Sequence, residues 1–264
     1  MRFTKMQGLG NDFLIFSGGP VSGAAEAARA LCDRVTGFGA DGIIFVFPCP
    51  EADFEMRIFN SDGSEALMCG NGIRCAGRWF YDKGHTKRTE LRVKTLSGIK
   101  TLFLQVKNGE TLSVTVDMGK VTVGEKSGCE VSGETLEYFP VDAGNPHAVI
   151  FTDGAESADI AKLGAEINRK IAPEYGVNVE FAQILSPLKF RMRVYERGCG
   201  VTAACGTGAC ACAAAAAKSG LCLYGSPLTA VLDGGLLELT VGRDSRVMMK
   251  GPAEYVSEGE TKAF

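Results

Sequence analysis

Hydrophobic and polar residues along this chain follow the two-residue period of β-strands more often than the period of helices. Short apolar or alternating stretches between glycine and proline turns predict strands within 2–16, 42–47, 91–116, 136–151, 178–184 and 228–249. Asn108-Gly109, between two alternating stretches, predicts a hairpin. Helical patterns are confined to 24–35, 161–171 and two alanine-rich stretches. Strands therefore outnumber helices, which predicts an α+β fold.

One stretch of the chain occurs twice. Residues 56–77 align without a gap with residues 192–213, pairing Met56 with Met192 at an offset of 136. The same offset places Cys69-Gly70-Asn71-Gly72 on Cys205-Gly206-Thr207-Gly208. Each copy predicts an apolar strand, a turn, and then a helix that opens at the cysteine.

Two weaker repeats extend this duplication. Gly10-Asn11-Asp12-Phe13 resembles Gly144-Asn145-Pro146-His147, and 39–45 resembles 176–181, in the same order in both halves. A period this long predicts two similar domains rather than a solenoid. We expect two pseudo-symmetric domains, each a strongly bent, mostly antiparallel sheet wrapped around a central helix. The first would cover 1–115, completed by a C-terminal strand at 252–264, and the second would cover 116–251.

The duplication also predicts chemistry. If the halves are related by a twofold axis, Cys69 and Cys205 lie on opposite sides of one cleft, each at a helix N-terminus. A helix N-terminus favours the thiolate and binds carboxylates through its free N–H groups. Two thiols flanking a carboxylate can remove a proton from one face of a carbon and replace it on the other. The pattern therefore indicates racemisation or epimerisation.

Composition restricts the alternatives. The 264 residues are 45% hydrophobic and carry a net charge of −3 without a basic block, so we expect neither a nucleic-acid partner nor an anionic membrane. No apolar run reaches the length of a membrane-spanning helix, and the N-terminus does not resemble a signal peptide. We therefore expect a cytoplasmic protein.

The ten cysteines are expected to be thiols in a reducing compartment. There is no C-x-x-C pair, and His85 and His147 are the only histidines, so we predict no metal site. Cys75, Cys210 and Cys212 fall inside the alanine-rich helices, where a small side chain packs well. Cys129 is expected in a loop.

Eight motifs, in order along nearly the full chain, resemble the diaminopimelate epimerase family, which are cofactor-independent amino-acid epimerases of lysine and cell-wall synthesis. They are Gly10-Asn11-Asp12-Phe13, Gly37-Phe38-Gly39-Ala40-Asp41-Gly42, Asn60-Ser61-Asp62-Gly63-Ser64, Cys69-Gly70-Asn71-Gly72, Gly144-Asn145-Pro146-His147, Asn178-Val179-Glu180-Phe181, Glu196-Arg197-Gly198 and Ala204-Cys205-Gly206-Thr207-Gly208. One departure is Gly42, where many members carry glutamine.

The resemblance implies roles for individual residues. Cys69 and Cys205 would be the acid–base thiols, with His147 and Glu196 placed to change their pKa values. Substrate would be bound by the backbone of Gly70, Asn71, Gly206 and Thr207, and by the side chains of Asn11, Asn60, Asn145, Asn178, Glu196 and Arg197. Arg197 would pair with the distal carboxylate of diaminopimelate and Glu196 with its distal ammonium. No cofactor is implied.

Other interpretations remain open for these residues. Asn11 and Asn145 lie in glycine turns, where asparagine is common for backbone reasons. Glu196 and Arg197 are also consistent with a surface ion pair, Asn60 and Asn178 with bridging between strands, and His147 with a turn. A proline or hydroxyproline racemase would use the same thiol chemistry, although proline offers no distal amino acid to bind. A redox switch or metal-binding module is the alternative from another class, and a homodimer also remains open.

Overall fold

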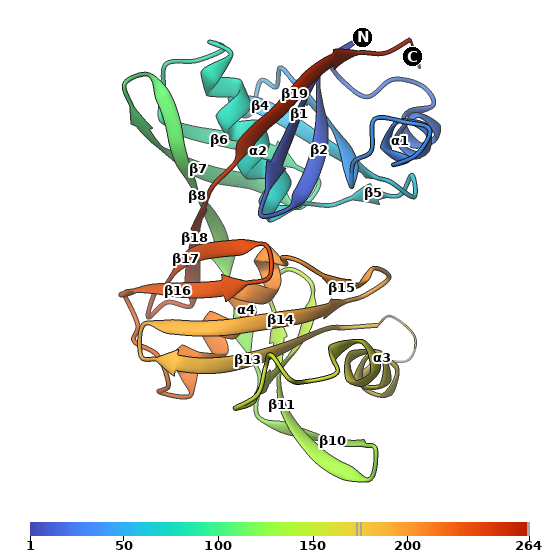
Figure 1. Ribbon diagram of the computed structural model, residues 1–264. Helices are drawn as coiled ribbons and strands as arrows, with labels where there is room; N and C mark the ends of the chain where they lie inside the picture. The colour runs from blue at the N-terminus through green and yellow to red at the C-terminus, as the bar shows by residue number, and fades with distance from the viewer. Residues whose placement is uncertain (173, 175, 263–264) are drawn as a thin grey trace. The chain divides into compact units, whose positions relative to one another are not determined.

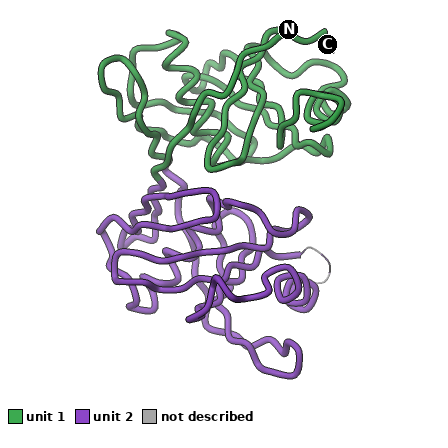
Figure 2. The backbone as a smooth tube through the Cα atoms, viewed as in Figure 1, with its two compact units in different colours: residues 1–116, 250–264 green, residues 117–249 purple. Residues whose placement is uncertain are grey.

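The computed structural model describes residues 1–172, 174 and 176–262. The chain divides into two compact units, residues 1–116 with 250–264 and residues 117–249 (Figure 2). Four helices and nineteen strands lie in the described residues, as expected for an α+β protein. Most strand pairs are antiparallel, and parallel pairs join β2 to β3, β4 to β6, β12 to β13 and β14 to β16. The sheets are therefore mixed.

Unit 1 is a curved sheet with one helix on each side. Along the sheet, each strand pairs with the next in the order β19, β1, β2, β3, β4, β6, β7, β8, and β5 adds to β4. Their bounds are β1 Arg2–Gly8, β2 Asn11–Ser17, β3 Gly42–Phe47, β4 Phe54–Asn60, β5 Glu65–Ala66, β6 Glu90–Thr95, β7 Gly98–Lys107, β8 Glu110–Lys120 and β19 Glu254–Glu260. The helices are α1 Ala24–Cys32 and α2 Gly70–Asp82.

Alternation along the strands divides the apolar residues of unit 1 between the two helices. Leu14 and Phe16 of β2 pack in the cluster that includes Leu31 of α1. Helix α2 packs on the other side, against β1, β2, β3, β4 and β7. Trp79 of α2 donates from Nε1 to Oγ1 of Thr4 on β1 at 3.1 Å. The central helix of this unit is thus held by both packing and a buried hydrogen bond.

The last strand of the chain belongs to the same sheet as the first. Strand β19 pairs antiparallel with β1, and the two lie side by side in Figure 1. The pairing runs from Arg2 opposite Glu260 to Gln7 opposite Glu254. The backbone N–H of Thr261 also donates to the carbonyl of Met1 at 2.8 Å. Unit 1 is therefore built from both ends of the chain.

Unit 2 is also a curved sheet with two helices. Strand β9 pairs with β11, then β10 with β11, β11 with β12, β12 with β13, β13 with β14, and β14 with both β15 and β16, which pairs with β17. The strands are β9 Thr122–Val123, β10 Ser127–Val131, β11 Glu134–Asp142, β12 Pro146–Phe151, β13 Asn178–Ser186, β14 Lys189–Glu196, β15 Gly200–Thr202, β16 Pro227–Leu232, β17 Gly235–Val241 and β18 Arg246–Gly251. The helices are α3 Ile160–Ile171 and α4 Gly206–Lys218.

Helix α4 is the buried helix of unit 2. Eleven of its thirteen residues are buried, and it packs against β9, β11, β12, β13, β14, β16 and β17. Alanine side chains are short, so strands can approach the helix closely from several directions without leaving voids. Helix α3 packs on the opposite side, in a cluster with Ile150 and Phe181.

Two predicted elements differ from the structure. The helix expected over 24–35 ends at Cys32, because the chain turns back on itself there. The N–H of Phe38 bonds the carbonyl of Leu31, and a Cβ on Gly37 would lie 2.4 Å from the carbonyl oxygen of Ala30. Cys129 lies not in a loop but in β10, because β10 and β11 form a hairpin at the glycine turn Ser132-Gly133. The strand predicted at 42–47 is confirmed as β3.

Candidate active site

Cys69 is the N-cap of α2. Its backbone is extended, with φ −137° and ψ 121°, and its Sγ accepts a hydrogen bond from the N–H of Gly72 at 3.4 Å. The N–H groups of a helix's first turn have no partner within the helix, so the sulfur lies at the positive end of the helix dipole. This confirms the helix start predicted from the first copy of the repeat, and it gives the sulfur a setting that favours negative charge.

Asn11 is the residue of the glycine turn that reaches Cys69. The Cys69 thiol donates to Asn11 Oδ1 at 3.6 Å, and Asn71 Nδ2 donates to the same oxygen at 3.3 Å. Asn11 Nδ2 in turn donates to Oδ2 of Asp41 at 2.6 Å. The structure thus brings three residues of the predicted site together in unit 1, and it adds Asp41 to them.

Asn60 lies at the end of β4, where it forms hydrogen bonds within a turn. Its Nδ2 donates to Oγ of Ser64 at 3.0 Å, and its backbone N–H donates to the Ser64 carbonyl at 2.8 Å. These bonds close the turn between β4 and β5. They fit the interpretation of Asn60 as a residue that bridges backbone elements, and its binding role stays a prediction.

Cys205 is the N-cap of α4, at the equivalent position of the second copy. It is only 5% exposed, and its Sγ lies 3.5 Å from Oγ1 of Thr207. Burial raises the pKa of the Cys205 thiol well above its ordinary value, and the charges of Glu196 and Glu180 raise it further. The hydrogen bonds of Thr207 and the Gly208 N–H act in the opposite direction. Cys205 is therefore held as a thiol in this state.

Glu196 lies at the end of β14, next to this thiol. Burial raises the pKa of Glu196, while its hydrogen bonds with Thr202 and Cys205 lower it. Thr202 donates its hydroxyl to Glu196 Oε1. The Glu196 carboxyl forms a hydrogen bond with the Cys205 thiol, and its negative charge opposes ionisation of that thiol. Glu196 is therefore placed to affect the charge on Cys205.

His147 forms a buried pair with Glu180 on the neighbouring strand. The Nδ1 of His147 lies 2.7 Å from Glu180 Oε1, and both side chains are fully buried. The Nε2 of His147 lies 3.0 Å from Oδ1 of Asn145. Because β12 and β13 are parallel in register, with His147 opposite Asn178, these side chains meet on one face of the sheet.

Glu180 is the residue of this group that reasoning from the sequence missed. Its Oε2 is buried without a hydrogen-bond partner among the described residues. A Cβ on Gly208 would lie 2.6 Å from its Oε1, so the carboxyl packs directly against the first turn of α4. The signal available in the sequence was an acidic residue at an inner position of an apolar strand.

Asn178 and Arg197 are joined through the backbone. Asn178 Oδ1 accepts a hydrogen bond from the Arg197 N–H at 2.9 Å, and Asn178 is buried whereas Arg197 is exposed. Asn178 therefore fixes where the turn after β14 begins. This gives Asn178 the bridging role that the sequence left open, and it positions the residue that bears the guanidinium.

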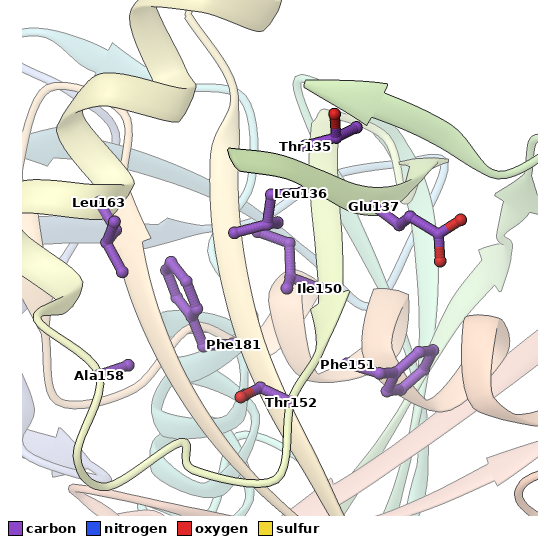
Figure 3. Close-up of a pocket in the computed structure, with 9 residues that line it drawn as sticks. All are labelled: Thr135, Leu136, Glu137, Ile150, Phe151, Thr152, Ala158, Leu163 and Phe181. Atoms are coloured by element: carbon purple, nitrogen blue, oxygen red, sulfur yellow. The ribbon is translucent and has the colours of Figure 1, made fainter. Parts of the chain in front are cut away.

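A hollow in unit 2 lies apart from these residues. It has a volume of about 390 Å³, and Figure 3 shows Phe181, Leu163 and Ile150 among the side chains that line it. Phe181 and Glu180 are consecutive on β13 and so point to opposite faces of the sheet. The hollow is therefore on the α3 face of the sheet, whereas Glu180 faces α4. The candidate site is identified by its cysteine, histidine and carboxylate side chains and not by this hollow.

Within the described part of the chain, no group of three or more histidine, cysteine, aspartate or glutamate residues is arranged to hold a metal ion. Across the same residues, no helix has both the length and the apolar character needed to cross a membrane.

Solved structures share this fold at low sequence identity. A probable proline racemase from Agrobacterium radiobacter K84 matches with a TM-score of 0.77 and 17% identity, over 98% of this chain and 92% of that one. A hydroxyproline epimerase from Agrobacterium vitis matches with a TM-score of 0.75 and 17% identity, over 98% and 91%. A PhzF-family phenazine biosynthesis protein from Bacillus anthracis matches with a TM-score of 0.74 and 17% identity, over 99% and 98%. The chain thus has the fold of this group of racemases, epimerases and PhzF proteins.

Sequence relatives define the family more narrowly. The family model described as diaminopimelate epimerase matches residues 3–124 and 139–256. A diaminopimelate epimerase of Desulfitobacterium hafniense is 42% identical over 277 residues, covering 98% of this chain and 97% of the relative. One from Parabacteroides distasonis is 41% identical over 266 residues, covering 99% and 98%. The chain belongs to the diaminopimelate epimerase family.

Proposed function

We propose that this protein is an amino-acid epimerase that interconverts L,L- and meso-2,6-diaminopimelate without a cofactor, in the synthesis of lysine and cell-wall precursors. The observation that carries the proposal is the pair of cysteine N-caps, Cys69 on α2 and Cys205 on α4, in a chain of this family. A cytoplasmic location is part of the same proposal. A homodimer would be tested by light scattering.

We also propose that the two units are copies of one fold, with domains at 1–115 plus 252–264 and at 116–251. The order of pairing supports this. In unit 1, β2 and β3 are parallel, β3 and β4 antiparallel, and β4 and β6 parallel. In unit 2, β12 and β13 are parallel, β13 and β14 antiparallel, and β14 and β16 parallel. A helix connects the first parallel pair in each unit, and another helix follows the third strand.

In the proposed mechanism, the thiolate of one cysteine takes the proton from the α-carbon. The thiol of the other cysteine donates its own proton to the opposite face of that carbon, so each turnover exchanges which sulfur carries the proton. The negative charge that develops between these steps is delocalised into the substrate carboxylate. The first N–H groups of α2 and α4, at Gly70, Asn71, Gly206 and Thr207, would bind that carboxylate and stabilise its charge.

The side chains assigned to the distal end of the substrate distinguish this function from proline racemisation. Arg197 is exposed, and its backbone is held by Asn178. A guanidinium presented in this way can pair with a free carboxylate through two hydrogen bonds. Asn60, Asn145 and Glu196 would complete the grip on the distal amino acid. Proline has no second carboxylate for these side chains to bind. In addition, the relatives that are 42% and 41% identical to this chain are diaminopimelate epimerases.

The decisive experiment starts from L,L-diaminopimelate in deuterated water and stops at low conversion. Two separate acid–base groups predict deuterium at the inverted carbon of the meso product and almost none in the remaining substrate. A single base that serves both faces would return original hydrogen to the product or deuterium to the substrate. Either of those results, or the absence of epimerisation, would contradict the proposal.

Single cysteine substitutions test the two-thiol mechanism in the same assay. Cys69→Ala and Cys205→Ala should each abolish epimerisation, because one remaining thiol serves only one face. Cys199→Ala, at an exposed cysteine outside the two Cys-Gly-x-Gly motifs, should leave the rate unchanged. An alanine variant at 69 or 205 that epimerises near the parent rate would refute the two-thiol mechanism.

A further inference from the structure

Four side chains in unit 1 form a row of hydrogen bonds that passes beside Cys69. Arg74 Nη2 donates to Asn71 Oδ1 at 2.9 Å, Asn71 Nδ2 donates to Asn11 Oδ1 at 3.3 Å, and Asn11 Nδ2 donates to Asp41 Oδ2 at 2.6 Å. The row connects the interior of α2 to the loop before β3.

The two ends of this row fix the orientation of both amides. A guanidinium can only donate hydrogen bonds and a carboxylate can only accept them. The oxygen of Asn71 must therefore face Arg74, and the NH₂ of Asn11 must face Asp41. If the Asn11 amide turned over, its oxygen would face the carboxylate and its NH₂ would face the NH₂ of Asn71. The row consequently has one direction, and the Asn11 oxygen is left facing Cys69.

Both ends of the row are themselves held in place. Arg74 is fully buried and also donates to the carbonyls of Gly70 and Pro252, at 3.0 and 3.1 Å. Asp41 accepts from Arg34 at 2.7 Å and from the Asp12 N–H at 3.1 Å. The ends therefore do not turn to follow the amides, and the amides must conform to the ends.

The consequence falls on the proton of Cys69. Asn11 Oδ1, 3.6 Å from the sulfur, accepts a hydrogen bond from the thiol but can offer nothing to a thiolate. The N–H of Gly72 acts in the opposite sense, because it donates to the sulfur. We propose that Asp41 and Arg74 are positioning residues that hold the Asn11 oxygen towards Cys69 and so keep this cysteine protonated until substrate binds. This rests on the proposed function, in which Cys69 is one of the two acid–base thiols.

The test compares Asp41→Asn with Asp12→Asn. Both aspartates pair with Arg34, but only Asp41 bonds the Asn11 amide in the described structure. An asparagine at 41 can donate or accept, so one of the two contacts that fix the Asn11 amide no longer sets its direction. The amide can then turn its NH₂ towards the sulfur more often and favour the thiolate. The readout is the rate of Cys69 alkylation by iodoacetamide at pH 7, followed by peptide mass spectrometry. We expect about a tenfold increase in Asp41→Asn and a change of less than about twofold in Asp12→Asn.

A double-mutant cycle separates an effect through Asn11 from the simple loss of a nearby charge. In an Asn11→Ala background, Asp41→Asn should leave the alkylation rate unchanged, because the amide through which Asp41 acts is gone. An equal increase in that background, or equal increases in Asp41→Asn and Asp12→Asn, would overturn the proposal. If Asp41→Asn does not fold, as judged by circular dichroism, Asp41→Ser is used, since a hydroxyl likewise leaves the amide orientation open.

This experiment can reject the positioning role of Asp41 without rejecting the proposed function, and the reverse is also true. Alkylation of Cys69 needs no turnover, whereas deuterium incorporation does. An active epimerase with unchanged alkylation in Asp41→Asn would reject the positioning role alone. Altered alkylation in a protein that does not epimerise diaminopimelate would reject the proposed function while leaving the hydrogen-bonded row as described.

Discussion

Single residues decide how much charge each candidate thiol carries. Around Cys205, burial is the largest influence and the carboxyl of Glu196 is the next, and both raise the pKa of the thiol. Glu196 is itself buried enough that its own pKa is raised. The surroundings of Cys205 therefore disfavour its thiolate form until the charge around the sulfur changes.

Glu196→Gln should make Cys205 more reactive. Glutamine has almost the same shape but no charge, so the pKa of Cys205 falls and more thiolate is present at a given pH. Each unit of decrease gives about tenfold faster alkylation below the pKa. Peptide-resolved alkylation of Cys205 at several pH values measures this. Glu166→Gln, which removes a half-buried carboxylate paired with Lys170 on α3, is the control and should have no effect.

The short Cys-Gly-x-Gly motifs were enough to predict part of the candidate site from the sequence. Cys69 and Cys205 could be predicted as helix N-caps because their copies share the same glycines, and both are observed as N-caps. Glu180 could not be predicted in the same way. Its partner His147 is on another strand, and only the parallel register of β12 and β13 brings the two together. Pairings of this kind depend on tertiary contacts that one sequence does not specify.

At the scale of elements, the two central helices begin alike but meet different neighbours. A Cβ on Gly72 of α2 would lie 3.1 Å from the terminal Cδ1 of Ile44, which can move aside. A Cβ on Gly208 of α4 would lie 2.6 Å from Oε1 of Glu180, which His147 holds. Equivalent glycines therefore tolerate a methyl group to different extents.

Gly208→Ala should destabilise the protein, whereas Gly72→Ala should have a smaller effect. Alanine in a helix interior normally gains about 1 kcal/mol over glycine. At Gly208 the overlap with a fixed carboxyl should reverse the sign, with a net cost of about 1–3 kcal/mol. Urea unfolding followed by circular dichroism measures both variants. Equal midpoints would show that Glu180 is free to move away from α4.

Element types were predicted more reliably than element ends. The strand at 42–47 follows from a continuous apolar run, but α1 ends at Cys32 because of backbone bonds made by Phe38 and neighbouring residues. These bonds depend on a turn whose path the helical pattern does not contain. The strand around Cys129 was missed because Val131 is its only buried residue, so its sequence shows little apolar alternation.

For the whole molecule, buried thiols link stability to alkaline pH. Burial raises the pKa of Cys75, inside α2, from 9.0 to about 12. Between pH 9 and pH 12, Cys75 therefore keeps its proton in the folded state and loses it in the unfolded chain. The stabilisation from this group is complete below about pH 9 and is lost as the pH rises from 9 towards 12.

Between pH 8 and pH 10.5, this one thiol should remove about 2 kcal/mol from the free energy of unfolding. Cys75→Ala lacks the titrating group, so its stability should fall by that much less over the same interval. Cys199→Ala, at an exposed cysteine, should keep the parent's dependence. Urea unfolding at the two pH values measures all three proteins. Identical pH dependence in the parent and Cys75→Ala would show that this thiol ionises in the folded state.

The pairing of β19 with β1 has a consequence for biosynthesis on the ribosome. Unit 2 is one continuous segment, residues 117–249, and all of its strands have been translated before β19 emerges. The sheet of unit 1 waits for Glu254–Glu260, and the carbonyls of Pro252 and Ala253 that Arg74 and Arg78 bond come equally late. Domains usually fold in the order of their translation. Here the unit whose first strands are translated first is completed last, so its apolar strands must avoid aggregation until β19 has been translated.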